Sequence, residues 1–148
     1  MSSEMQDKQT ALDCRYIRMA QIWAENSYCK RRQVGALLVK NKTIISDGYN
    51  GTPAGFKNIC EDENGHTYPY VLHAEANAIT KIARSGNSSE GATLYVAMHR
   101  MFETDYTGRY HPGRFFGALP TERRYRIAKR GRYQSRFYRY KINTPLNT

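Results

Sequence analysis

The chain has 148 residues, of which 40% are hydrophobic, and this is enough for one globular domain with a single core. Its formal net charge of +10 lies almost wholly near the C-terminus: residues 97–148 hold 12 Lys and Arg against 3 Asp and Glu, whereas residues 1–96 hold 11 against 10. No apolar run approaches the roughly 18 residues that span a bilayer, so no membrane segment is expected. Three cysteines are too few for a disulfide scaffold, and we expect a cytoplasmic protein with reduced thiols.

The hydrophobic pattern predicts regular structure in the first two thirds of the chain. Met1–Thr10 is polar, and we expect it to be a disordered leader. Apolar residues at helical spacing predict a helix over Ala11–Glu25. The apolar runs Val34–Val39 and Thr43–Tyr49 flank a short polar turn, which is typical of a β-hairpin.

Three further elements follow the hairpin. Asn50–Ile59 contains glycine and proline and is a predicted loop. Leu72–Arg84 is a predicted second helix, and Thr93–Val96 is a predicted third strand. We therefore assign residues 11–96 to the N-terminal part of one α/β domain.

The last third, residues 97–148, does not continue this pattern. It contains ten aromatic residues but only four Ile and Leu and no valine. Its Arg and Tyr residues recur with neither the period of a strand nor that of a helix. We expect a basic tail that is incomplete or disordered, without a buried strand or an amphipathic helix.

The sequence His73-Ala74-Glu75 at the start of the second helix indicates metal chemistry. A catalytic zinc ion has three protein ligands and one open position for water, whose pKa it lowers to about 7. A carboxylate that is not a ligand then moves protons from the water to the substrate. His73 suits the ligand and Glu75 the proton carrier, as in the H-x-E signature of zinc deaminases. On its own, so short a motif also fits an ordinary helix start with a solvated Glu.

Four segments in the right order resemble the dCMP deaminases of the zinc-dependent cytidine and deoxycytidylate deaminase family. They are Val34–Val39, the loop Gly48–Phe56, the run Leu72–Ile79 and the strand Thr93–Val96. The resemblance implies a three-layer α/β/α fold with a mixed sheet and Zn²⁺ as cofactor. It also implies dCMP as the substrate, hydrolytic deamination to dUMP and a homo-oligomer.

The same resemblance implies roles for residues outside the H-x-E motif. Asn50 is expected to contact the nucleotide sugar, and Gly51–Phe56 to shape the pocket wall. Ser27 and Arg31 or Arg32 are candidates for the phosphate, because a guanidinium donates two parallel hydrogen bonds. A solvated basic turn is the alternative for the two arginines.

A second, structural zinc is also implied, because some dCMP deaminases hold one near the substrate loop. Cys29 and Cys60 match its cysteines, and His66 is a third candidate ligand. Only two ligands are clear, whereas a closed zinc site has four. Two unpaired buried thiols are the alternative, and Cys14 is expected to pack in the first helix.

The family pattern fails immediately after the third strand. The family has P-C-x-x-C at this point, but Ala97–Phe102 contains no cysteine, and none follows Cys60. Two of the three catalytic zinc ligands are therefore absent. His99 and His111 have no partner at ligand spacing, so we expect the chain to hold zinc poorly and to be inactive.

Reading the codons one base later restores the missing ligands. Met98-His99 then contains TGC and Met101-Phe102 contains TGT, which both encode cysteine whichever synonymous codons are used. The codons of Ala97-Met98 can supply the preceding proline. Further on, Asp105–Tyr110 can be read as I-I-Q-A-G followed by Ile or Thr, and Arg132–Phe137 as G-I-R-V-V-F. We therefore predict a frame change near residues 95–97, which also accounts for the charge of the tail.

A second class of function remains open from the sequence. The Arg- and Tyr-rich residues 97–148 could bind nucleic acid by contacting phosphates and stacking on bases. The segment contains no recognisable binding module, so the enzyme lineage is favoured. Salt-dependent nucleic-acid binding that disappears when residues 97–148 are deleted would distinguish the two.

Overall fold

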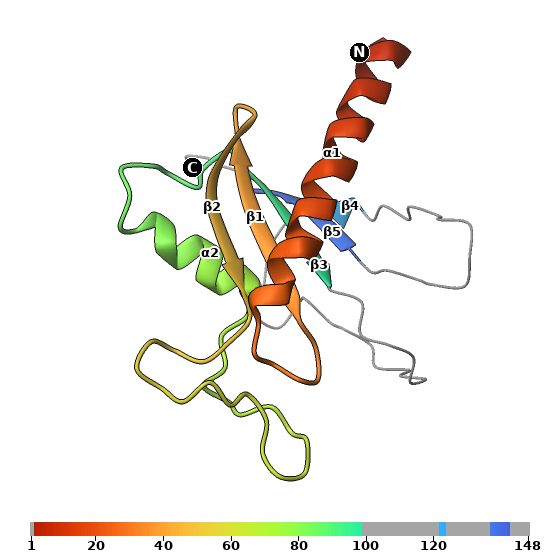
Figure 1. Ribbon diagram of the computed structural model, residues 1–148. Coiled ribbons are helices and arrows are strands. Elements are labelled where there is room, and N and C mark those ends of the chain that lie inside the picture. Colours follow the sequence, from red (N-terminus) through yellow and green to blue (C-terminus); the bar gives the residue numbers. More distant parts are fainter. Residues whose placement is uncertain (1, 99–121, 124–136, 143–148) are drawn as a thin grey trace, which may run out of the picture.

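Two helices of the chain lie on opposite faces of one sheet (Figure 1). The computed structural model describes residues 2–98, 122–123 and 137–142. In these residues the helices are α1 (Ser3–Trp23), the 3-10 helix η1 (Ala24–Asn26) and α2 (Ala74–Ile82), and the strands are β1 (Val34–Lys40), β2 (Thr43–Tyr49), β3 (Thr93–Met98), β4 (Glu122–Arg123) and β5 (Phe137–Lys141). The strand order is β2-β1-β3-β5-β4. None of the described helices is long and apolar enough to cross a membrane.

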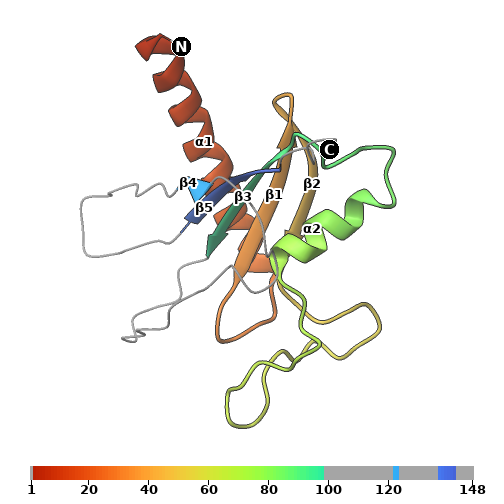
Figure 2. The same ribbon diagram turned by 180° about the vertical axis from the view of Figure 1, so that it is seen from behind.

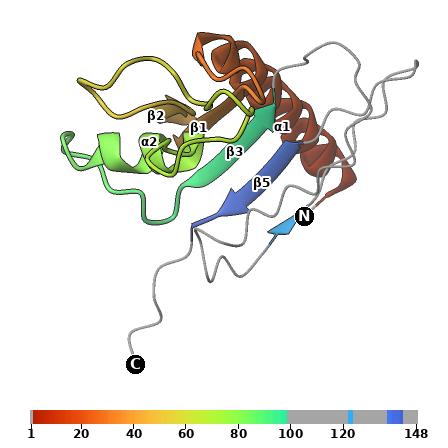
Figure 3. The same cartoon turned by 90° about the horizontal axis from the view of Figure 1, so that it is seen from below.

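The layers match the predicted three-layer α/β/α arrangement. α1 packs on β1 and β3, and α2 packs mainly on β2 and β1 (Figures 2 and 3). The core under α2 includes Ala36, Leu38, Leu94, Val96 and Ala78. The core under α1 includes Tyr16, Ile17, Ala20, Leu37 and Tyr95. Alternate residues of β1 thus serve both cores, which explains why this strand is apolar without interruption.

Two glycines allow the helices to approach the sheet closely. A Cβ atom on Gly35 of β1 would lie 2.0 Å from the Ala20 carbonyl oxygen of α1. A Cβ atom on Gly48 of β2 would lie 2.4 Å from the Ala74 carbonyl oxygen of α2. Both contacts are with backbone atoms, so any larger residue would push a helix away from the sheet.

The predicted disordered leader is helical in the structure, and that prediction was wrong. α1 begins at Ser3, eight residues before the expected start. The Ser2 hydroxyl accepts a hydrogen bond from the Met5 backbone N–H at 3.3 Å, which caps the helix. Lys8 and Glu4 form an ion pair at 2.7 Å within the first turns. Capping and one ion pair extend the helix through a segment that has no apolar pattern.

The sheet also differs from the prediction in its strand directions. We expected a mixed sheet, but every strand pair in the described part of the chain is antiparallel. We expected a tail without a buried strand; residues 137–141 nevertheless form β5, which pairs with β3 from Thr93 to Ala97, although its described side chains are half-buried at Arg139 and exposed at Lys141. Without β5, the backbone of β3 would form an unpaired sheet edge, and such edges readily accept another strand. The other predictions for residues 97–148, including those for His99 and His111, lie outside the described residues.

Candidate functional site

His73 and Glu75 lie at the N-terminal end of α2. His73 is the N-cap residue, with extended backbone angles (φ −67°, ψ 152°), and its side chain is exposed. Glu75 occupies the first turn and is 4% exposed. The N-terminus of a helix favours negative charge, so this buried carboxylate has a suitable position. The structure thus brings the two residues of the predicted motif to one end of one helix.

Two hydrogen bonds fix α2 against β2. The Ser46 hydroxyl donates to the Ala78 carbonyl oxygen at 2.6 Å, and this bond is buried. The Asn77 side chain donates to the Tyr49 carbonyl oxygen at 2.8 Å. Sequence reasoning assigned no role to either residue. Asn77 lies in the same segment, Leu72–Ile79, as His73 and Glu75. This position is the only feature of the sequence that pointed to Asn77.

Asn50 follows β2 directly, and its side chain bonds to the backbone that leads into β1. Its Oδ1 accepts a hydrogen bond from the Val34 N–H at 2.9 Å, and its Nδ2 donates to the Arg32 carbonyl oxygen at 2.8 Å. The Ser27 hydroxyl donates to the Asn50 carbonyl oxygen at 2.7 Å. Ser27 is 4% exposed and also accepts from the Cys29 N–H. Ser27 therefore holds Asn50 in place.

A backbone bridge joins the end of β2 to the start of α2. The Gly51 N–H donates to the Leu72 carbonyl oxygen at 3.1 Å, and the Leu72 N–H donates back to Gly51 at 2.8 Å. This pairing places Asn50 and Gly51 next to the residue that precedes His73. The structure thus assembles four predicted site residues from two elements that lie far apart in the sequence.

The two arginines among the phosphate candidates, Arg31 and Arg32, precede β1. The Arg31 backbone N–H donates to Glu61 Oε1 at 2.9 Å, which ties this segment to the loop after β2. Arg31 is exposed, and Arg32 is half-buried. An open pocket of about 690 Å³ lies between Tyr28–Arg31 and Asn58–His66. Neither His73 nor Glu75 lines this pocket.

Cys29 and Cys60 form a disulfide in the structure, with their Cα atoms 5.1 Å apart. The expectation of reduced thiols was wrong for this pair, because the folded loops bring the two residues within disulfide distance. Cys14 is a free cysteine, as expected. The disulfide joins the segment before β1 to the loop after β2.

His66 interacts with Asp62. Its N–H donates to Asp62 Oδ1 at 2.9 Å, and its Nδ1 lies 3.6 Å from Asp62 Oδ2. The backbone hydrogen bond from His66 is the main reason that the pKa of Asp62 lies below its usual value. In the described part of the chain, no group of three or more His, Cys, Asp or Glu is placed to hold a metal ion. The second zinc site of Cys29, Cys60 and His66 therefore stays a prediction.

A family model agrees with the segments that carry the resemblance. The model of the cytidine and deoxycytidylate deaminase zinc-binding region matches residues 10–101. The chain belongs to this family. Membership implies zinc as the cofactor of the deaminase family, and the match ends at residue 101.

Named deaminases are similar to the same part of the chain. The deoxycytidylate deaminase of Enterobacteria phage T4 is 33% identical in an alignment that covers 55% of this chain and 64% of the relative. That of Saccharomyces cerevisiae is 36% identical over 93 residues, covering 56% and 29%. The dCMP deaminase of cyanophage S-TIM5, solved in complex with dCMP and dUMP, is 43% identical with a TM-score of 0.54, covering 65% and 66%. The chain thus spans less than two thirds of the length of these relatives.

The residues of this deaminase-family chain do not fit a catalytic zinc ion. Three protein ligands are needed, and among the described residues His73 is the expected ligand that lies near Glu75. No cysteine follows Cys60, and the disulfide occupies the thiols of Cys29 and Cys60. The described residues bring no other ligand group together. Glu75, the expected proton carrier, is buried in the first turn of α2, whereas the described residues do not complete a set of three ligands.

Proposed function

We propose that the chain carries the N-terminal part of a dCMP deaminase, and that in its present form it does not deaminate dCMP to dUMP. The position of His73 and Glu75 at the start of α2, beside Asn50 and Gly51, supports the reaction class. The absence of any cysteine after Cys60 supports the loss of activity. This incomplete ligand set is the observation on which the proposal depends.

Hydrogen-bonding capacity supports the proposed roles in binding dCMP. Asn50 uses one lone pair of Oδ1 and one hydrogen of Nδ2 within the protein. Oδ1 can therefore accept, and Nδ2 can donate, one further hydrogen bond with a sugar hydroxyl. Ser27 has one hydroxyl hydrogen and donates it to Asn50. Arg31 and Arg32 are therefore better suited than Ser27 to donate hydrogen bonds to the phosphate. Gly51 forms part of the pocket wall. Glu75 would move protons during the reaction.

We also propose that residues 97–148 are translated out of frame. The shifted frame permits P-C-x-x-C at the end of β3, where the family has it. Sequencing the gene tests this proposal without any protein. Codons whose shifted reading lacks the proline before the two cysteines, or lacks the I-I-Q-A-G and G-I-R-V-V-F runs, would contradict it.

The enzymatic part of the proposal is tested with the purified full chain. We expect no conversion of dCMP to dUMP and far less than one zinc ion per chain by elemental analysis. The control is a version with the frame restored at residues 95–97, which should bind one zinc ion and turn over dCMP. In that version, Glu75→Ala should abolish turnover but keep the metal, since Glu75 is not a ligand. Stoichiometric zinc together with normal turnover in the chain as it stands would refute the proposal.

A further inference from the structure

The sequence contains two Asn-Gly pairs, Asn50-Gly51 and Asn64-Gly65. In such a pair the glycine backbone nitrogen can attack the side-chain carbonyl carbon of the asparagine, because glycine has no side chain to hinder the approach. A cyclic succinimide forms, the C–N bond of the side-chain amide breaks, and its nitrogen leaves as ammonia with the proton of the glycine N–H. Water then opens the ring at either carbonyl and gives aspartate or isoaspartate. The reaction needs no other reactant, so the surroundings of each pair decide whether it proceeds.

The folded chain restrains both reacting groups of the first pair. The Asn50 side chain is bonded at both ends: Oδ1 accepts from the Val34 N–H at 2.9 Å, and Nδ2 donates to the Arg32 carbonyl oxygen at 2.8 Å. The Gly51 N–H donates to the Leu72 carbonyl oxygen at 3.1 Å. Attack at Asn50 therefore requires several hydrogen bonds of a half-buried segment to open together.

The second pair lies at the exposed tip of a loop whose ends, Glu61 and Thr67, are joined by a backbone bridge. The Asn64 backbone N–H donates to Asp62 Oδ1 at 2.9 Å, and the Gly65 N–H donates to the Asp62 carbonyl oxygen at 3.0 Å. Within the described residues, the side-chain amide of Asn64 has no hydrogen-bond partner. One solvent-exposed backbone bond is thus the restraint on the attacking nitrogen.

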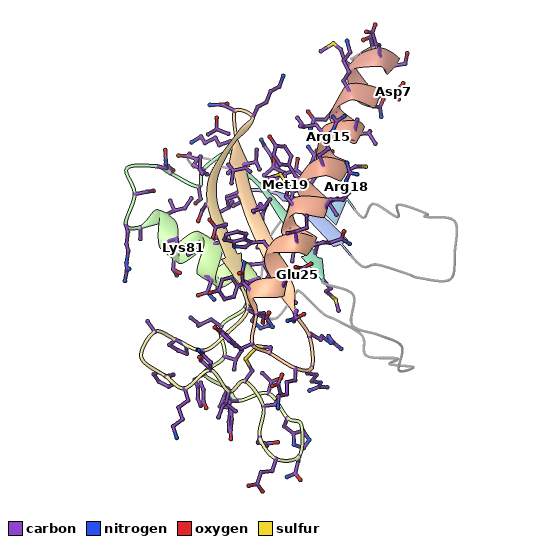
Figure 4. The ribbon with its side chains drawn as sticks, in the orientation of Figure 1. Asp7, Arg15, Arg18, Met19, Glu25 and Lys81 are labelled. Atoms are coloured by element: carbon purple, nitrogen blue, oxygen red, sulfur yellow. A yellow bond between two sulfur atoms is a disulfide. The ribbon has the colours of Figure 1, made fainter. Side chains whose placement is uncertain are left out.

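We propose that Asn64 is a site of spontaneous deamidation in the folded protein, whereas the fold protects Asn50 from the same reaction. The loops after β2 extend away from the sheet, with the disulfide of Cys29 and Cys60 near their base (Figure 4). Opening the turn at Asn64 therefore breaks no contact of the sheet or of the helices. Such local opening of an exposed loop requires little free energy.

Deamidation of Asn64 changes the pocket beside this loop. The pocket of about 690 Å³ is lined by Asn64 and by the charged residues Lys30, Arg31, Glu61, Asp62 and Glu63. The product places a further carboxylate in this lining. The isoaspartate form also lengthens the backbone within the turn in which Asp62 Oδ1 accepts from the N–H groups of Asn64 and His66. The charge and the shape of the pocket wall are therefore both altered.

Peptide mapping by mass spectrometry tests the proposal on the purified full chain. The protein is kept in mildly alkaline buffer, which favours loss of the glycine N–H proton, and is sampled over time. We expect Asn64 to convert to aspartate and isoaspartate at least about tenfold faster than Asn50, because Asn50 reacts only after its hydrogen bonds open. In urea both pairs are unfolded, and the two rates should become similar.

Asn64→Gln is the matched control, because glutamine would have to close a larger ring and reacts far more slowly. Isoelectric focusing should show an acidic form that accumulates in the wild type and is absent from N64Q, and thermal unfolding shows that both are folded. Asn64 that stays intact in the folded chain would overturn the proposal, and so would equal conversion of Asn50 and Asn64 before urea is added. The measurement involves neither zinc nor dCMP, so its failure is distinct from a failure of the proposed function.

Discussion

Asp13 is a buried carboxylate between α1 and the sheet, with 2% exposure. It accepts hydrogen bonds from the Tyr95 hydroxyl at 2.5 Å and from Gln9 Nε2 at 2.8 Å, and Arg139 Nε lies 3.5 Å away. A buried charge is tolerated only when it is paired and hydrogen-bonded. Asp13 therefore links α1 to β3 and β5 through specific polar contacts.

We predict that Tyr95→Phe destabilises the fold by about 1–3 kcal/mol near neutral pH, because Asp13 loses a buried hydrogen-bond donor. Burial and the hydrogen bond to Asp13 raise the pKa of Tyr95 above its usual value of about 10. The contribution of Tyr95 to folding stability is therefore fully present below pH 10 and is lost as the pH rises above 10. The stability difference between wild type and Tyr95→Phe should narrow above about pH 10.

Urea unfolding from pH 8 to pH 11 measures this difference. Tyr28→Phe is the control, because Tyr28 is 63% exposed. That variant should match the wild type over the whole range. A gap between wild type and Tyr95→Phe that stays constant to pH 11 would contradict the assigned role of the Tyr95 proton.

At the scale of single elements, the distance between helix and strand depends on the two glycines. We predict that Gly35→Ala and Gly48→Ala each destabilise the protein by about 2–3 kcal/mol, because the new Cβ meets helix backbone that cannot move alone. Gly86→Ala is the matched control, since its Cβ would meet nothing within 4 Å. Chemical unfolding of the three variants tests this prediction. Equal stability of all three would show that the helices can move without cost.

Local patterns predicted some elements well and missed others for physical reasons. β2 has the predicted bounds, and β1 extends one residue beyond them, because an apolar hairpin is encoded in adjacent residues. The start of α1 depends on the Ser2 cap, which the apolar pattern does not report. β5 depends on the free edge of β3, and residues that are forty or more positions apart in the sequence pair there.

The same distinction applies to the candidate site. His73 and Glu75 share one helix turn, so their short motif predicted that they lie together. The position of Asn50 beside the start of α2 followed only from the resemblance to the family. The support of Asn50 by Ser27 requires a contact across 23 residues, which only the folded chain defines. No local signal predicted the disulfide.

At the scale of the whole molecule, the disulfide links the two segments that flank the candidate site. Cys29 and Cys60 are 31 residues apart, and a loop of that length contributes about 3–4 kcal/mol by restricting the unfolded chain. We predict that a reducing agent lowers the melting temperature of the wild type. The double variant Cys29→Ser/Cys60→Ser should melt at this lower temperature with or without the reducing agent. Cys14→Ser should behave like the wild type.

The same measurement bears on the second zinc site. Zn²⁺ added to the reduced wild type should raise the melting temperature again if Cys29 and Cys60 bind the metal with His66. His66→Ala would then lose part of this effect. An unchanged melting temperature when Zn²⁺ is added to the reduced protein would contradict the predicted second zinc site. An unchanged melting temperature on reduction, with both thiols shown to be free, would contradict the role of the disulfide.

The hydrogen bond between Asp13 and Tyr95 spans 82 residues of the chain. Protein synthesis delivers α1 first, but α1 packs on β3 as well as on β1, and β3 leaves the ribosome last among the elements up to Met98. The apolar side of α1 must therefore stay in water while the hairpin and α2 are still being made. During this interval, nascent chains would be most dependent on chaperones that bind exposed amphipathic helices.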